Sequence, residues 1–233
     1  SQSFKHKQIL HLARSKILIF TQDDVLFAPG TLKQIHDSFV ANPKITFISI
    51  RNQPLTPISF IESILNVGTA INNRIAARWN QGDNYLSVVG RCMAYRTSWA
   101  KMTLNVPKTI ATTDAYHYFN NQKHGGVYRY LENAILYYRN PAKLSEYMRK
   151  SSRFIYSQAE MSHYFTDLSQ SYHVPYSIKL FALLNEFLRQ PIRFFLYFIV
   201  YAYSRIFKLR QAKVLNPIWE IDVSTKKISV GHL

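Results

Sequence analysis

The chain has 233 residues, of which 47% are hydrophobic and 15% aromatic, enough for one large domain or for one domain with an appendage. Its 29 Lys and Arg residues against 13 Asp and Glu give a formal net charge of +16, which predicts an anionic partner such as a nucleotide, a nucleic acid or an acidic lipid. Cys92 is the only cysteine, which excludes an intrachain disulfide and a multi-thiolate metal site and fits a reducing compartment.

The first predicted elements alternate between helix and strand. Residues 4–15 carry apolar side chains at helical spacing, and residues 17–20 form a short apolar run that predicts a strand buried on both faces. A second helix opens after Pro29-Gly30 and ends before Asn42-Pro43, and residues 44–50 predict a second strand. This alternation predicts a parallel sheet with crossover helices.

Two adjacent carboxylates, Asp23 and Asp24, follow the first strand. In open α/β sheets, ligands gather at the carboxyl ends of the strands. Adjacent acids repel each other unless they share a cation, and carboxylate oxygens suit Mg²⁺ or Mn²⁺. Such a cation would neutralise a diphosphate. The alternative is that both acids cap the next helix.

The middle of the chain continues with mixed elements. The pattern predicts a helix over residues 58–79, a strand over 86–95, a helix ending at 123, a strand pair or strand-turn-strand over 127–138, and a helix over 142–157. Gly90 interrupts the predicted strand over 86–95, where a simple bulge is one interpretation. Asp114 precedes the helix that ends at 123, and an Asp in that place is by default an N-cap.

The last third has a different composition. Tyr176–Lys213 contains seven Lys or Arg residues and one acid, Glu186, around the uncharged run FFLYFIVYAYS. That run is too short to cross ~30 Å of hydrocarbon, although residues 188–207 reach the ~20 residues needed, with an arginine near each end. An interfacial helix, basic on one face and aromatic on the other, is the alternative. Both interpretations predict a membrane contact, which an aromatic belt flanked by cations favours over a soluble core helix.

The segment Ile17–Pro29 resembles the strand and acidic motif of family 2 glycosyltransferases. In that family an apolar strand leads into Asp-x-Asp, an apolar residue and a Pro-led helix. Gln22 stands at the first acidic position of this pattern, Asp23 at the middle and Asp24 at the last. The resemblance implies that Asp24 is the main metal ligand and Asp23 the second, while Gln22 departs from the pattern and belongs to the donor site.

Two further segments extend the resemblance. Gly90 and Arg91 are similar to the place where the family has a glycine close to the donor sugar and the acceptor. Asp114 matches an acid at the start of a helix, which implies the role of general base on the acceptor hydroxyl, and Thr113 replaces the family's Glu. A carboxylate at a helix N-terminus keeps its charge and can accept a proton from a polarised hydroxyl.

The resemblance also covers a helix and the C-terminal tail. Lys150, Arg153 and Phe154 stand where the family has Gln-x-x-Arg-Trp, which implies contacts to donor or acceptor. An arginine beside an aromatic plane suits a phosphate or a stacked sugar, and a solvated basic face is the alternative. Trp219, followed by Ser224-Thr225-Lys226-Lys227, is similar to the tail of membrane-bound members of the family.

Together these segments run from about Ser1 to Lys227, and they imply an α/β fold. Residues 1–160 are expected to form a partial GT-A (Rossmann-like) mixed sheet with flanking helices, and residues 161–233 a membrane-associated helical region and tail. The implied enzyme is metal-dependent, with Mg²⁺ or Mn²⁺, and moves a sugar from a nucleotide-diphosphate sugar to a sugar or lipid-linked acceptor. Its catalytic part is expected to be cytoplasmic and membrane-associated.

The family's nucleotide-binding half precedes the acidic motif, whereas this chain starts about one helix before it, without a recognisable signal peptide. We therefore expect the chain to be the C-terminal part of a transferase, possessing at most part of its activity.

Three other classes of function fit parts of the sequence. A phosphatase of the haloacid dehalogenase type also begins with a strand and Asp-x-Asp, but its nucleophile would fall at Gln22, and an amide cannot serve. A nucleic-acid-binding protein would explain the charge, yet the surplus thickens around the apolar C-terminal segment, which favours membrane phosphates over nucleic acid. A non-catalytic membrane-bound remnant stays open because of Gln22 and the missing nucleotide-binding half.

Overall fold

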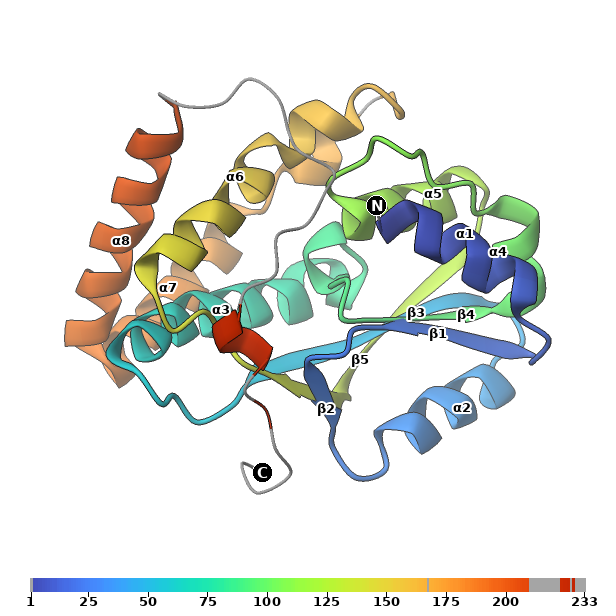
Figure 1. Ribbon diagram of the computed structural model, residues 1–233, viewed down its shortest axis with the longest axis horizontal. Coiled ribbons are helices and arrows are strands. Elements are labelled where there is room, and N and C mark those ends of the chain that lie inside the picture. The colour runs from blue at the N-terminus through green and yellow to red at the C-terminus, as the bar shows by residue number, and fades with distance from the viewer. Residues whose placement is uncertain (1, 167, 210–222, 227, 229–233) are drawn as a thin grey trace.

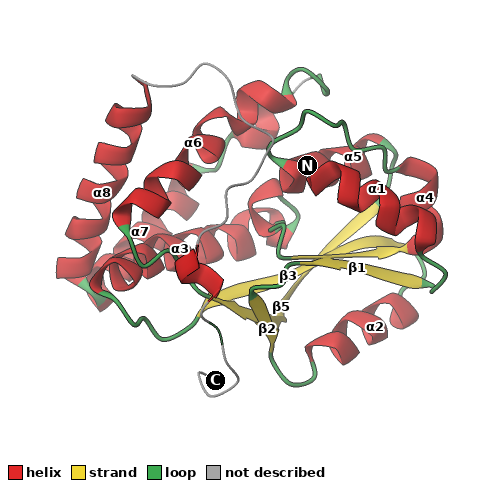
Figure 2. Ribbon diagram, in the orientation of Figure 1, coloured by secondary structure: helices red, strands yellow, loops and turns green. Residues whose placement is uncertain are grey.

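The computed structural model describes residues 2–166, 168–209, 223–226 and 228, and among them leaves out the side chains of residues 2–3, 149–150, 152–155, 207–209 and 223. The described chain forms a layered α/β fold in which helices cover both faces of one sheet (Figures 1 and 2). The strands are β1 (Ile17–Thr21), β2 (Val25–Phe27), β3 (Ile45–Pro54), β4 (Cys92–Arg96) and β5 (Val127–Tyr138). Their order across the sheet is β1-β4-β3-β5-β2.

The sheet is mixed, as the resemblance implied, and the prediction of a parallel sheet is wrong. Only β3 and β5 pair in parallel, and the other neighbours are antiparallel. Strand β4 lies between β1 and β3 with the opposite direction, because the chain turns back through residues 79–91 and enters β4 at the carboxyl edge of the sheet.

Strand β1 is an edge strand, and only one of its faces is fully buried, so the prediction of burial on both faces is wrong. It pairs only with β4, from Ile17 opposite Arg96 to Thr21 opposite Cys92. Leu18 and Phe20 are buried on one face, whereas Ile17 on the other face is only half-buried. An apolar run of this length does not reveal how many neighbours its strand will have.

Two other strand predictions also need correction. The strand expected over residues 86–95 begins only at Cys92, and Gly90 lies in the turn before it. The expected strand pair over 127–138 is one strand, β5. Its register against β3 jumps from Leu131 to Ile135, so the three intervening residues bulge out of the ladder instead of forming a turn.

The helices occur near the predicted places with shifted ends. They are α1 (Gln2–Leu12), α2 (Thr31–Ala41), α3 (Phe60–Arg78), α4 (Thr97–Thr103), α5 (Thr113–Lys123), α6 (Leu144–Met161), α7 (Tyr176–Arg189) and α8 (Pro191–Leu209). Helix α2 covers one face of the sheet, and α1, α3, α4 and α5 lie on the other (Figure 1). Gly30 caps α2 with a φ of 79°, a left-handed conformation that glycine adopts without strain.

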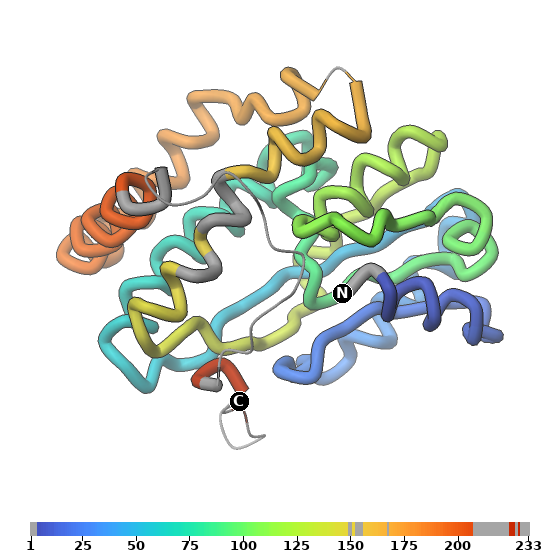
Figure 3. Tube along the Cα trace, turned by 45° about the horizontal axis from the view of Figure 1, so that its top comes forward, coloured from blue at the N-terminus to red at the C-terminus, as the bar shows by residue number. Residues whose placement is uncertain are grey.

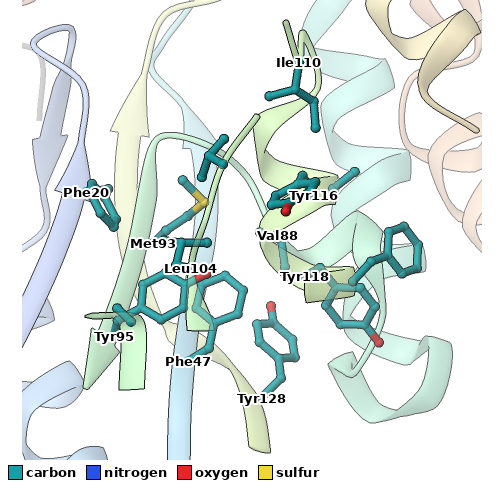
Figure 4. Close-up of a cluster of buried hydrophobic side chains, with 14 of the residues drawn as sticks. Phe20, Phe47, Val88, Met93, Tyr95, Leu104, Ile110, Tyr116, Tyr118 and Tyr128 are labelled. Atoms are coloured by element: carbon teal, nitrogen blue, oxygen red, sulfur yellow. The ribbon is translucent and has the colours of Figure 1, made fainter. Parts of the chain in front are cut away.

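The core beneath α1, α4 and α5 is rich in aromatic rings (Figure 4). Phe47 of β3 stacks on Tyr95 of β4 with ring centroids 4.3 Å apart, and Tyr128 of β5 lies 5.1 Å from Phe47. Such contacts add to the stabilisation that apolar burial provides. The central strands β3, β4 and β5 are therefore packed together through these rings. The site residues described below lie at the carboxyl edge of this sheet.

Helices α7 and α8 lie beside α3 and form an outer layer (Figure 3). Helix α7 ends at Arg189, and Gln190 has non-helical angles (φ −152°, ψ 70°) before Pro191 opens α8. The predicted segment 188–207 therefore crosses a helix break. Within the described ranges, no helix is long and apolar enough to cross a membrane. The division into residues 1–160 and 161–233 stays a prediction.

Candidate active site at the carboxyl edge of the sheet

Asp23 and Asp24 lie in the short bend that joins β1 to β2. Strand β1 ends beside Cys92, and β2 begins beside Tyr138, the last residue of β5, so the bend lies at the carboxyl edge of the sheet. Asp23 is exposed, whereas Asp24 and Gln22 are half-buried. The N-cap of α2 is Gly30, which rules out the interpretation that the two acids cap that helix.

The C-terminal 3₁₀ helix η4 (Val223–Lys226) returns to this bend. Lys226 Nζ forms an ion pair with Asp23 and lies 4.0 Å from Asp24 Oδ2. The Thr225 hydroxyl donates to Asp24 Oδ2 at 3.1 Å. The hydrogen bond and the charge of Lys226 lower the pKa of Asp23. An ammonium group of the tail therefore stands between the two proposed metal ligands.

A third tail residue, Ser224, attaches η4 to α6. Its hydroxyl donates to the carboxylate of Glu146 and accepts a bond of 3.0 Å from the Ala142 N–H. Residues 224–226 of the tail are thus held at the acidic bend from two sides, whereas Trp219 and Lys227 lie outside the described residues.

The acidic bend supplies few ligands for a divalent cation. Among the residues that the structure describes, no three His, Cys, Asp or Glu side chains form a group able to hold a metal. Asp23 and Asp24 supply two carboxylates, and Mg²⁺ commonly uses one or two carboxylates together with substrate phosphates. The pair therefore fits a cation that arrives with a diphosphate, provided that Lys226 withdraws. Metal dependence stays a prediction.

Asp114 is the second residue of α5, and the N-cap is Thr112, so the interpretation of Asp114 as the N-cap is wrong. Burial raises the pKa of Asp114, while the N–H groups of Ala115 and Gly90 and the charge of Arg91 oppose the rise. The Ala115 N–H donates to Asp114 Oδ1 at 2.9 Å. A carboxylate with a raised pKa takes up a proton more readily, which suits a general base.

Gly90 and Arg91 lie next to Asp114. A Cβ added to Gly90 would come 3.9 Å from Asp114 Cβ. The Arg91 guanidinium lies 3.8 Å over the ring of Tyr138, a residue of β5 that the sequence did not single out. The Thr21 hydroxyl donates to the Arg91 carbonyl at 2.9 Å and so joins this turn to the end of β1.

Glu160, near the end of α6, is a further residue of this region that the sequence did not predict. Its carboxylate accepts the N–H groups of Ala111 at 2.7 Å and Thr112 at 2.9 Å, and also the Thr112 hydroxyl. These bonds hold the chain just before α5 and so position Asp114. A glutamate near a helix C-terminus is unfavourable for the helix dipole, a weak signal of an outside partner.

Three predicted binding residues lie on α6. The backbone of this helix includes Lys150, Arg153 and Phe154. Their side chains lie outside the described residues, so the contacts proposed for them stay predictions.

The mixed α/β fold with its five-stranded sheet and flanking helices resembles the GT-A fold. The solved structure of the mannosyltransferase PcManGT from Pyrobaculum calidifontis, in complex with GDP-Man and Mn²⁺, is similar with a TM-score of 0.50 and 13% sequence identity. The similarity covers 88% of this chain and 55% of that protein, so the chain spans about half the length of its structural neighbour. No family model and no curated protein matches the chain.

Proposed function

We propose that the protein is a glycosyltransferase that moves a sugar from a nucleotide-diphosphate sugar to an acceptor hydroxyl. The observation that carries this proposal is the placement of Asp114, Arg91 and the acidic bend on one edge of a GT-A-like sheet. The similar mannosyltransferase was solved with GDP-Man and Mn²⁺, which supports a nucleotide sugar as the donor. Which sugar is transferred depends on contacts outside this edge.

In the proposed reaction, Asp114 accepts the proton of the acceptor hydroxyl. The acceptor oxygen then bonds to the anomeric carbon, and the bond from that carbon to the diphosphate oxygen breaks with its electron pair on the diphosphate. Arg91 is stacked on Tyr138, and this stacking leaves the guanidinium edge free to meet a phosphate. A divalent cation held by Asp23 and Asp24 would neutralise the leaving diphosphate.

The role of Asp114 can be tested with GDP-mannose as the probe. The variant Asp114→Asn should lose sugar transfer while its affinity for GDP-mannose stays unchanged, because it removes the base but not the diphosphate site. The control Asp37→Asn changes an exposed carboxylate on α2 that pairs with Lys33, and should affect neither property.

Two outcomes would overturn this proposal. Loss of GDP-mannose binding in Asp114→Asn would make the residue structural. Wild-type protein that binds neither GDP-mannose nor another nucleotide sugar would favour the non-catalytic remnant.

The membrane contact is the second part of the proposal. Nine large apolar or aromatic side chains of α7 and α8 are exposed, and we call them the apolar ridge: Tyr176, Leu180, Leu184, Leu188, Ile192, Phe195, Ile199, Tyr203 and Ile206. They recur every three or four residues, the spacing of one helix face. The only acid on these helices, Glu186, is buried. A face of this kind flanked by arginines suits the interface of an anionic membrane.

The proposed membrane contact is best tested with point substitutions, because α7 and α8 also bury apolar side chains against α3. Leu188 and Ile192 are 78% and 76% exposed, and Leu188→Gln with Ile192→Gln should weaken co-sedimentation with phosphatidylglycerol vesicles. Met102→Gln, which removes a side chain that is 72% exposed on α4, is the matched control. High salt should weaken binding without abolishing it, because screening acts on the charges and not on apolar burial. Complete release by salt, or an unchanged double variant, would contradict the interfacial ridge.

A further inference from the structure

A cavity of about 360 Å³ opens on the α3 side of the sheet, and no residue of the acidic bend belongs to its lining. It lies between β3, β5, α3 and the junction of α7 with α8, and its charged lining consists of Arg51, Arg74, Arg189 and Glu132. The bulge of β5 lies opposite Arg51, where the register jumps from Ile50 to Arg51 on β3. The irregular pairing of β3 with β5 at this point therefore leaves space for a concave surface, which regular pairing would close.

Arg51 is the central group of this cavity. Its side chain is partly buried on β3, and its Nε is buried without a hydrogen-bond partner in the described part of the chain. The guanidinium contributes to the electrostatic environment of the neighbouring Tyr130 but forms no ion pair among the described residues. A buried donor without an acceptor is unfavourable, and a guanidinium is suited to two parallel bonds with a phosphate or carboxylate.

The surrounding charges favour an anion. Arg74 pairs with Glu186 at 3.1 Å, yet its own Nε is also buried and lacks an acceptor among the described residues. Arg189 lies exposed at the end of α7. Glu132 is the one carboxylate of the lining and opposes an anion, but even with Glu186 counted the three arginines remain in excess.

A second basic cavity, at the amino end of β1, is a weaker candidate. It is larger, about 590 Å³, and is lined by Arg14, Lys16, Arg96 and Lys101. Arg96 already donates to the backbone carbonyls of Ile45, Phe39 and Asn42, and the other three cations are exposed. Arg96 therefore has acceptors for its donors, whereas the buried Nε of Arg51 has none among the described residues.

We propose that the Arg51 cavity binds a phosphate group, at a site separate from the acidic bend. Two sources share this chemistry: the head group of an anionic lipid and soluble phosphate. The cavity reaches Arg189 and Gln190, which lie between Leu188 and Ile192 of the apolar ridge. A lipid whose chains meet the ridge therefore has its phosphate near the cavity, and this lipid arm alone rests on the membrane contact proposed above.

The test measures binding by calorimetry with two probes, inorganic phosphate and monomeric dioctanoyl phosphatidic acid. Wild type is compared with Arg51→Gln and with the matched control Arg129→Gln, which removes the same charge from an exposed position on β5. Arg129 is adjacent to Tyr130 in the strand and so points to the opposite face. Wild type and Arg129→Gln should bind alike, and Arg51→Gln about tenfold more weakly or worse, since a charge-assisted bond is lost.

The two probes distinguish the sources. Phosphatidic acid that binds much more tightly than inorganic phosphate, with both weakened by Arg51→Gln, assigns the site to a lipid head group. Equal affinities assign it to soluble phosphate. Arg51→Gln with wild-type affinity for both probes, an equal loss in Arg129→Gln, or wild type that binds neither probe would overturn the site.

A failure of this site is separable from a failure of the proposed transferase activity. GDP-mannose binding is expected to be the same in Arg51→Gln and wild type. Asp114→Asn should in turn keep its affinity for inorganic phosphate. Thermal unfolding of each variant, read by circular dichroism, reports whether the fold is intact.

Discussion

Lys226 and Asp23, which are 203 positions apart in the sequence, form an ion pair at the carboxyl edge of the sheet. The same ammonium group lies 4.0 Å from Asp24. The tail therefore supplies a positive charge at the place where a divalent cation was predicted. A cation bound there would compete with the Lys226 ammonium group for the same carboxylate oxygens.

This relationship predicts that Lys226→Met strengthens Mn²⁺ binding at the acidic bend. The Lys226 and Asp23 side chains are 36% and 81% exposed, so the pair contributes little, and removing it should tighten binding about two- to fivefold. Electron paramagnetic resonance of free Mn²⁺ gives the affinity directly. Lys33→Met, which breaks a comparable exposed pair with Asp37 on α2, should leave it unchanged. An unaltered affinity in Lys226→Met would show that the tail does not compete with the cation.

Glu160→Gln should destabilise the protein and misplace Asp114. The amide keeps one acceptor oxygen but turns an NH₂ group toward N–H donors, so at least one of the bonds to Ala111 and Thr112 is lost. Leaving such donors unpaired costs about 1–3 kcal/mol. Urea unfolding measures this loss, and Thr112→Val, which removes only the hydroxyl bond, should lose less. Equal stabilities of Glu160→Gln and wild type would contradict the positioning role.

A buried histidine pair should make the fold sensitive to acid. His6 Nδ1 lies 3.2 Å from His117 Nε2, and His117 Nδ1 lies 2.8 Å from the Tyr95 hydroxyl. Burial lowers the pKa of His6 from 6.5 to about 4 and that of His117 well below its usual value. The unfolded chain therefore binds more protons than the folded one below about pH 6.5. Stability is full above that pH and is lost as the pH falls toward 4.

The free energy of unfolding, measured between pH 4 and 8, checks this prediction. Each histidine contributes a slope of about 1.4 kcal/mol per pH unit within its window. His6→Gln should reduce the slope, whereas His11→Gln, at an exposed position on α1, should not. A flat profile in wild type would mean that the pair is not buried in the neutral form.

Gly68→Ala should loosen the attachment of α8 to α3. A Cβ at Gly68 would come 2.4 Å from two ring carbons of Tyr197. Overpacking of this kind costs about 1–3 kcal/mol, which outweighs the gain of about 1 kcal/mol that Ala brings over Gly within a helix. Chemical denaturation should show a net loss that the double variant Gly68→Ala with Tyr197→Leu restores in part. A more stable Gly68→Ala protein would rule out the close helix approach.

Local patterns in the sequence were sufficient for the α/β class, for most helices and for the acids at the end of the first strand, but they predicted a parallel sheet where the structure has a mixed one. The turn residues and the spacing of apolar side chains decide these features, and both act over a few positions. Gly90, Arg91 and Asp114, which the sequence singled out separately, lie together in the structure. Their assigned roles, and those of Asp23, Asp24 and the α6 residues, remain predictions.

Contacts between residues that are far apart in the sequence could be identified only from the tertiary structure. Periodicity indicates which face of a strand is buried but not which strand lies beside it, so the edge position of β1 and the reversed direction of β4 were missed. For the same reason the sequence did not predict the hydrogen bond from Thr112 to Glu160 or the ion pair of Lys226 with Asp23. Nor did it predict that Arg51 Nε is buried without an acceptor among the described residues. Each depends on long-range packing that brings separate elements to one place, and no local sequence signal encodes that distance.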